Sequence, residues 1–170
     1  MQDANEVDLT QFKRWYSQAG TPHVFIESEY EAGQLKLIFK QTCPETPDHD
    51  EKKPFHIPIK MALFDDRGQP IAMDNDILEL RETEQTFHFD GLQGKPVISL
   101  LRDFSAPIIL HQEQSQQELI QKLRFETDGF AKWDAAQKLA LSALTSFYAL
   151  SRAEWELPQI FIQTFSSILE

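Results

Sequence analysis

The chain has 170 residues, a length that holds one domain, or one domain and part of a second. Hydrophobic residues make up 41% of it, the usual share for a protein with a packed core, and no apolar run approaches the length of a membrane span. Sixteen Lys and Arg against 27 Asp and Glu give a formal net charge of −11. Such a surface repels phosphate backbones and anionic lipid, so we expect neither nucleic acid nor a membrane as a partner.

The first predicted element is a helix that begins near Asp8 and ends before Gly20. Asp8 and Gln11 have the spacing of a capping box, and Gly20 suits the C-terminal cap. Its apolar face consists of aromatic residues at i, i+3, i+4 spacing, namely Phe12, Trp15 and Tyr16. A helix of about three turns is marginal by itself in water, so we expect this face to pack on a partner surface.

From residue 22 to about residue 112 the pattern is that of short β-strands. The predicted strands are apolar or alternating segments at 23–26, 35–39, 56–64, 69–73, 78–80, 85–90, 97–101 and 107–110. Turns are expected at 31–33 and at 65–68, and in the second of them Gly68 can take positive φ. No long helical pattern lies between the strands, which disfavours a parallel sheet. The stretch therefore predicts an antiparallel Ig-like β-sandwich of seven to eight strands.

The pattern changes to helical at Ser115, which forms a capping box with Glu118. That helix is broken at Asp128-Gly129, and a long helix follows, whose expected apolar side is Phe130, Trp133, Ala136, Ala140, Leu144 and Phe147. A third helix is predicted from Leu157-Pro158, and its apolar face is Ile160, Phe161, Phe165 and Ile168. No stop signal precedes Glu170, which indicates a truncation, with a fraying terminal helix as the alternative.

The predicted fold class is therefore mainly β with α, in three parts. Residues 1–21 hold the N-terminal helix, residues 22–112 the sandwich, and residues 113–170 a C-terminal segment of about three helices. The single cysteine, Cys43, excludes an internal disulfide and fits the reducing cytoplasm, and the acidic first residues lack the pattern of a signal peptide. We expect a cytoplasmic protein.

Few side chains form a pattern that predicts chemistry. None of the histidines has a His or Cys partner at a recognised ligand spacing, and we expect solvated, outward-facing imidazoles at His23, His49, His56, His88 and His111. His56 is placed opposite the apolar face of its strand, and His88 shares a strand face with Asp90.

Other polar groups favour equally simple interpretations. Asp74-Asn75-Asp76 resembles the start of a calcium loop but has Glu79 where the loop requires Gly. Cys43 lacks the electropositive setting that activates a thiol, although His49 is near in sequence. Two carboxylate pairs could resemble a glycosidase site. The hairpin turn explains Asp65 with Asp66, and solvation explains Glu82 with Glu84. The sequence predicts no catalytic, cofactor-binding or metal-ligating residue.

Several stretches in order resemble the bacterial aminopeptidase N family of zinc metallopeptidases. They are residues 12–22, 46–48, 54–58, 84–90, 104–107 and 133–137, within a resemblance that runs from about residue 8 to about residue 169. The resemblance implies that residues 8–16 are the tail of a catalytic domain, that the sandwich follows it, and that residues 115–170 open a large helical domain. Those catalytic and helical domains of the parent would be the partners.

The family's catalytic signatures are absent. Its zinc motif is His-Glu-x-x-His and its exopeptidase motif is Gly-x-Met-Glu-Asn, but no His and no Met of this sequence is followed by Glu. The resemblance therefore implies a non-catalytic fragment of an aminopeptidase, with zinc held elsewhere in the parent. A free-standing sandwich that binds peptide or carbohydrate is the alternative, and a hydrolase using carboxylates is a third. We also expect self-association through exposed apolar faces, on the third helix and on Phe12, Trp15 and Tyr16.

Overall fold

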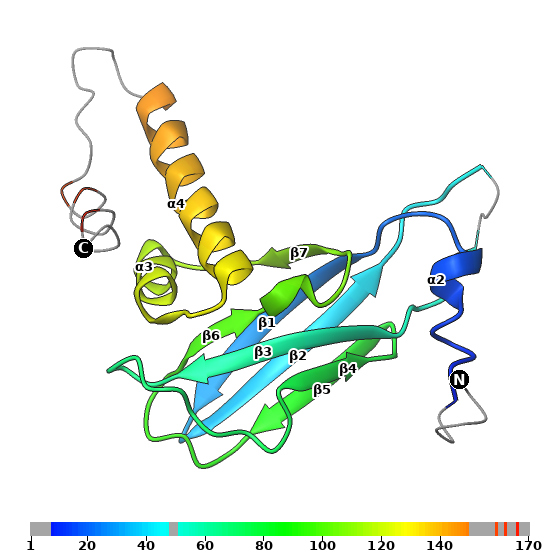
Figure 1. The fold of residues 1–170 in the computed structure, drawn as a ribbon, viewed down its shortest axis with the longest axis horizontal. Helices are drawn as coiled ribbons and strands as arrows, with labels where there is room; N and C mark the ends of the chain where they lie inside the picture. The colour runs from blue at the N-terminus through cyan, green and yellow to red at the C-terminus, as the bar shows by residue number, and fades with distance from the viewer. Residues whose placement is uncertain (1–7, 48–50, 150–158, 160–161, 163–165, 167–170) are drawn as a thin grey trace.

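The computed structural model describes residues 8–47, 51–149, 159, 162 and 166. Its strands form two packed sheets, with the orders β5-β2-β1-β7 and β4-β3-β6. They are β1 (His23–Glu31), β2 (Gln34–Thr42), β3 (Ile57–Phe64), β4 (Ile77–Leu80), β5 (Glu84–Phe89), β6 (Val97–Leu100) and β7 (Ile109–Gln112). The helices are α2 (Arg14–Ser17), the 3₁₀ turn η1 (Arg102–Phe104), α3 (Gln116–Phe125) and α4 (Gly129–Ala149). The expected sandwich, with helices before and after it, is confirmed (Figure 1).

The β1–β2 hairpin shows how the sequence produces the sheet. Ala32 and Gly33 both have positive φ, at 49° and 82°, as a two-residue hairpin turn requires. The turn sets the register Glu31↔Gln34, and every second residue of β2 then points into the core. Leu35, Leu37 and Phe39 are consequently 0% exposed.

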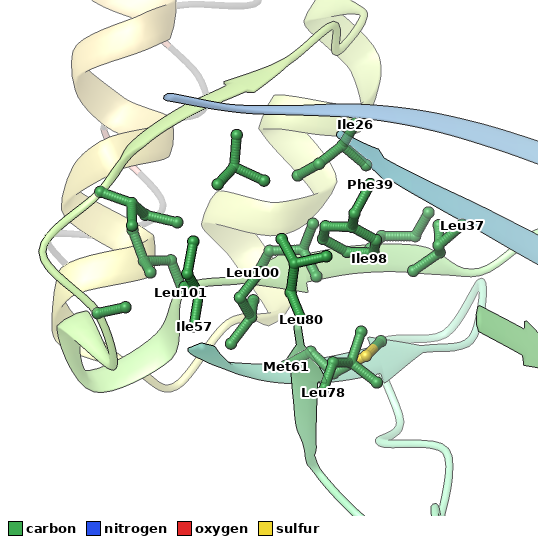
Figure 2. Packing of buried hydrophobic residues seen from close by; sticks show 14 of the residues in the cluster. Ile26, Leu37, Phe39, Ile57, Met61, Leu78, Leu80, Ile98, Leu100 and Leu101 are labelled. Carbon is green, nitrogen blue, oxygen red and sulfur yellow. The ribbon is translucent and has the colours of Figure 1, made fainter. Parts of the chain in front are cut away.

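One apolar core lies between the two sheets. Figure 2 shows side chains from both sheets converging on it, among them Ile26, Leu37, Phe39, Ile57, Met61, Leu80, Ile98 and Leu100. The Phe39 ring meets the Phe87 ring edge to face, with centroids 5.5 Å apart. β3 is buried along most of its length, because Ala62 and Phe64 pack with Val97 and Phe125 in a second cluster.

The sandwich differs from the prediction in two places. Residues 69–73 form only a bridge between Pro70 and Phe64, not a strand, since Pro70 has no N–H to donate to a ladder. β7 pairs with β1 in parallel, whereas every other strand pair is antiparallel. The chain reverses through η1 before β7, and this turn delivers β7 alongside β1 in the same direction.

The N-terminal helix is shorter than predicted. The α-helical turn covers only Arg14–Ser17, and the Asp8–Gln11 capping box was wrong. Asp8 Oδ1 accepts the N–H of Thr10 at 2.8 Å, and the Gln11 amide bonds to the sandwich instead. The predicted aromatic face is split as well, because Trp15 packs on the sandwich while Tyr16 is 87% exposed.

In the C-terminal segment the Ser115–Glu118 capping box is confirmed, but the buried face of α4 differs from the predicted one. Ala135 and Leu139 pack with Leu119 and Leu123 of α3, and Ala136 of the predicted face packs against this cluster. Small Ala side chains let the two helices approach, and Trp133 and Leu144 are left 57% and 63% exposed. The proposed start of the third helix at 157–158 lies outside the described residues, as do its four face residues and the side chain of Phe147.

Candidate functional site

The segment that contains α2 is fixed to one end of the sandwich by side-chain contacts. Gln11 Nε2 donates to the carbonyls of Arg81 (2.6 Å) and Pro54 (3.2 Å), and Trp15 Nε1 donates to the carbonyl of His56 at 2.8 Å. The Trp15 ring lies 4.5 Å from the Phe55 ring, centroid to centroid. We call Gln11 and Trp15 with their acceptors the N-terminal clamp.

A buried amide supports this clamp from inside. Gln41 is 4% exposed; its Nε2 donates to the carbonyls of Phe55 and Glu82, each at 2.9 Å, and its Oε1 accepts the N–H of Phe55 at 2.7 Å. The amide thus uses both donor hydrogens and its oxygen to join β2 to two irregular segments. An apolar side chain here would leave these backbone groups unpaired.

His56 lies beneath the same clamp. Its side chain is buried under the Phe12 ring, edge to face at 5.9 Å, so the expected outward-facing position was wrong. His56 directly precedes β3, and the Phe12 ring of the N-terminal segment covers its imidazole, which is 9% exposed. Burial lowers the pKa of His56, Arg81 lowers it further, and the Glu79 carboxylate, 3.8 Å from Nε2, opposes them.

At the opposite end, ionic groups join the sandwich to the helices. Glu126 is 2% exposed, and its Oε1 accepts from Arg102 Nε at 3.2 Å and from the N–H groups of Thr127 and Asp128 at 2.7 Å. Arg102 also donates to the Thr127 hydroxyl at 3.1 Å. The Asp103 N–H donates to Asp128 Oδ2 at 3.0 Å. We call Arg102, Asp103, Glu126 and Asp128 the C-terminal clamp.

Asp128 has a second task in this clamp. Its Oδ1 accepts the N–H of Ala131 at 2.8 Å and so caps α4. The Asp103 carboxylate pairs with Lys60 of β3 at 2.6 Å, and this hydrogen bond is the main reason that the pKa of Asp103 is lowered. The clamp therefore connects β3, η1 and the start of α4.

The backbone of the clamp is strained. Leu101, Asp103 and Phe104 all have positive φ, between 50° and 59°, which L-residues rarely adopt. Leu101 is 4% exposed and its burial helps to hold this conformation. Nearby, Gly68 has φ +80°, and a Cβ at this position would overlap the Phe125 ring at the end of α3.

A buried cation lies between α3 and α4. Lys122 is 0% exposed, and its Nζ is 3.9 Å from Asp134 Oδ2, which pairs more closely with Lys138 at 2.8 Å. Burial lowers the pKa of Lys122, and Asp134 opposes this effect. The loose pairing leaves this lysine a weak contributor to stability.

Two histidines that are far apart in the sequence are neighbours in the structure. His23 Nδ1 lies 2.9 Å from His111 Nε2, on the paired strands β1 and β7. The expectation that no histidine has a histidine partner was drawn from spacing along the chain, and these two are 88 residues apart. His88 and Asp90 are exposed as predicted, and His49 lies outside the described residues.

The remaining candidate groups have structural roles. Burial raises the pKa of the Cys43 thiol, with Lys52 opposing it, so this thiol is not activated. Asp65 Oδ1 accepts the N–H groups of Arg67 and Gln69 within the predicted turn, and Asn75 Oδ1 accepts that of Ile77. Asp66, Asp74, Asp76, Glu82 and Glu84 are exposed.

Three-ligand metal chemistry is not supported by the described side chains. Across residues 8–47 and 51–149, no three His, Cys, Asp or Glu side chains are grouped to hold a metal ion. A catalytic zinc site takes three protein ligands and an open position, so these residues do not fit the zinc centre of a metallopeptidase.

A groove follows the open side of the sandwich, where β4 and β5 are the facing edges of the two sheets. Its volume is about 700 Å³. Its lining includes the apolar side chains of Leu78, Phe87 and Phe89 and the polar side chains of Arg81, His88 and Asp90.

Apart from Trp15, which was expected to pack on a partner surface, the residues that build the two clamps were missed by sequence reasoning. Gln11 was interpreted as a helix cap, and nothing in a single sequence relates Arg102 to Glu126 or Gln41 to Phe55. The one available signal was Asp128 before a helical pattern, which has N-cap chemistry and was interpreted as a break.

Comparisons with known proteins agree with this fold. Residues 20–113 match the family described as a domain of unknown function (DUF3458) with an Ig-like fold, and residues 116–170 match its companion DUF3458_C, described as ARM repeats. Aminopeptidase N of Escherichia coli (strain K12) is 43% identical over 147 residues, and that of Haemophilus influenzae is 40% identical over 147 residues. Each alignment covers 82% of this chain and 17% of the relative, so the chain spans about a sixth of their length.

A solved structure shows the same architecture. Legionella pneumophila aminopeptidase A, in complex with aspartic acid, superposes with a TM-score of 0.83 at 28% identity, over 99% of this chain and 19% of that one. In the described part of this chain, no helix combines the length and apolar character needed to cross a bilayer. The chain belongs to the DUF3458 family of Ig-like domains, and its homologues include aminopeptidases N.

Proposed function

We propose that the chain is a non-catalytic segment of a zinc-dependent aminopeptidase N. In this proposal the parent removes N-terminal amino acids from peptides, and the sandwich links and orients its catalytic and C-terminal helical domains. The homology to aminopeptidases N over most of the chain supports the assignment to such an enzyme. The connecting role is inferred from the two clamps.

The observation that carries the proposal is the placement of the clamps at opposite ends of one rigid sandwich. Figure 1 shows α2 at one end and α3 with α4 at the other. The N-terminal clamp bonds to backbone carbonyls of residues 54, 56 and 81, and the C-terminal clamp joins η1 to residues 126–128. Directional contacts to a close-packed core fix the angle at which each helical part leaves the sandwich.

The chemistry of the parent is expected to come from outside this segment. The described residues lack a fitting three-ligand group, so zinc and its ligands would belong to the catalytic domain. We propose a cytoplasmic location, which the single cysteine fits.

Neighbouring domains would cover the apolar side chains that this segment leaves in water. Those on α4 are Trp133, Leu141 and Leu144, each more than half exposed, and Ile162 is 45% exposed further along. ARM repeats stack so that each buries the apolar face of the one before it, which suits further helices of the parent on α4. By itself the chain should associate at high concentration, and light scattering would measure this.

A chimera tests the connecting role. The matching 147 residues of Escherichia coli aminopeptidase N are replaced by those of this chain, and hydrolysis of an amino-acid p-nitroanilide is measured. We expect the chimera to retain activity, and Glu126→Ala in it to lower kcat/KM or heat stability, because the C-terminal clamp loosens. Exposed Glu84→Ala is the matched control. An inactive but folded chimera, or equal effects of both substitutions, would count against the connector.

The isolated chain supplies the complementary measurement. Purified protein with added zinc should release no amino acid from the same substrate. Steady turnover that persists after repeated purification would show a catalytic centre within these residues.

One observation favours a second candidate, a module that binds an extended peptide. The groove is lined by the aromatic residues Phe87 and Phe89, among others, and β4 and β5 are each the edge strand of a sheet. A peptide could add to such an edge as a further strand. Titration with a mixed library of short peptides, followed by NMR at Phe87 and Phe89, would detect this binding, and unchanged signals would exclude it.

A further inference from the structure

The pair formed by His23 and His111 has no role in either clamp. His23 begins β1, and His111 lies on β7, the last strand before α3. Because Phe25 is the register partner of His111, the two imidazoles lie diagonally across the strand pair on the same face. Their rings are within 14° of parallel, with centroids 5.1 Å apart and the nearest nitrogens 2.9 Å apart.

The surroundings hold this pair in place while leaving it accessible. The Phe25 ring stacks on His111 at 4.4 Å and 9°. Both imidazoles are half-buried on the outer face of the sheet, opposite the side of β1 that carries Val24 and Ile26. A hollow of about 820 Å³ beside His111 is lined by Glu27 and Glu113, among other residues.

Two neutral imidazoles at this spacing are the ligands that a borderline-soft divalent ion selects. Metal–nitrogen bonds of about 2.0–2.1 Å place adjacent ligand nitrogens roughly 3 Å apart, close to the spacing seen here. We propose that His23 and His111 form a two-histidine site for a divalent transition metal such as zinc, nickel or copper. Water would complete the coordination, and the carboxylates of Glu27 and Glu113 add negative charge beside it.

Metal binding puts an ion in the place of the proton that His23 Nδ1 and His111 Nε2 share in their hydrogen bond. Without metal, one facing nitrogen must donate its N–H to the other. On binding, that proton moves through solvent to the far nitrogen of the same ring, so both facing nitrogens present lone pairs and both imidazoles stay neutral. The rings must turn to direct both lone pairs at one ion, and the accessible side of the pair gives room for this.

The ligand set also predicts selectivity. Imidazole suits zinc, copper and nickel, whereas magnesium and calcium take oxygen ligands. Copper should bind most tightly, following the usual order of divalent ions. Bound metal would hold β7 against β1 and thereby strengthen the connection to α3, an effect that does not depend on the aminopeptidase assignment.

The test uses the full chain, free of metal and of any affinity tag. Zinc chloride or nickel chloride is titrated into it by calorimetry, and the melting temperature is measured with and without metal. The wild type should take up one equivalent and melt at a higher temperature with metal. His23→Gln and His111→Gln should each weaken binding by about tenfold or more. His88→Gln, on exposed β5, and His49→Gln should leave it unchanged.

Histidine side-chain NMR of the wild type gives a second reading that needs no variant. Nickel should broaden the imidazole signals of His23 and His111 first, and excess calcium should not reverse this. The proposal is overturned if the wild type binds no ion, or if folded His23→Gln and His111→Gln variants bind it as tightly as the wild type.

Discussion

The centre of the sandwich and the connection between β6 and the helices are held together by opposite means. The centre is apolar and made of side chains such as Phe39 and Ile59, which are fully buried and need only shape and volume. The connection at the C-terminal clamp depends on Arg102, Glu126 and a strained backbone. The difference suggests that the packed sandwich supplies stability, whereas the clamp sets direction.

The largest expected effect tests the apolar half of this comparison. Phe39→Ala removes a fully buried ring that contacts Phe87, and it should lower the free energy of unfolding by about 3–5 kcal/mol. Urea unfolding followed by circular dichroism measures this loss. Tyr16→Ala, which removes an 87% exposed ring, should change it by less than about 0.5 kcal/mol. Similar losses in both variants would mean that the core is not the main source of stability.

The next effect tests the polar half. Glu126→Ala leaves the Arg102 guanidinium and the N–H groups of Thr127 and Asp128 without their acceptor, so we expect a loss of about 2–4 kcal/mol. Glu126→Gln keeps an acceptor oxygen and should lose less. Exposed Glu84→Ala is the control. If hydrogen exchange slows or stays constant in α3 and α4 of the Ala variant, the clamp does not hold these helices.

The two regions also differ in what the sequence could predict. The sequence predicted the strand at 35–39 and the turn at 31–33, and in the structure a period of two then leaves one choice of face, which buries Leu35, Leu37 and Phe39. On α4 the same kind of reasoning placed Trp133 on the apolar side and left out Ala135. Hydrophobicity favours the larger side chain, but close approach to α3 requires the smaller one.

The contacts at the candidate sites were beyond prediction for a different reason. Gln41, Glu126 and the His23–His111 pair act through partners that only the folded topology brings near. A polar side chain has no periodicity that reveals its partner. The sequence therefore predicted the sandwich and the Ser115 cap, while the clamps and the buried position of His56 required the structure.

A glycine substitution tests the contact between the sandwich and α3. Gly68→Ala places a methyl group against the Phe125 ring at a residue with positive φ, and it should destabilise the protein by about 2–3 kcal/mol. Gly91 also has positive φ, at 74°, but a methyl group there would have no described atom within 4 Å, so Gly91→Ala should cost about 1 kcal/mol. Chemical denaturation of both variants isolates the steric part. If both variants lose the same free energy of unfolding, the Phe125 ring of α3 moves aside at no cost and α3 is not packed tightly on the 65–68 turn.

The smallest expected effect is a pH dependence at the N-terminal clamp. Burial lowers the pKa of His56 in the folded protein, so between that value and the unfolded value near 6.5 the unfolded chain binds more protons. The stability contributed by neutral His56 is therefore complete above the unfolded value and is lost as the pH falls through the folded one. The slope cannot exceed about 1.4 kcal/mol per pH unit for one proton.

Comparing His56→Gln with His88→Gln separates this contribution from those of other groups. The free energy of unfolding is measured from pH 7.5 to pH 5, and the difference between wild type and His56→Gln should shrink or change sign toward acid, because Gln carries no proton penalty. His88 is exposed on β5, and its substitution should leave the wild-type pH profile in place. A profile that keeps its full slope in His56→Gln would mean that Phe12 does not shield the imidazole, and that the N-terminal clamp opens at its aromatic edge.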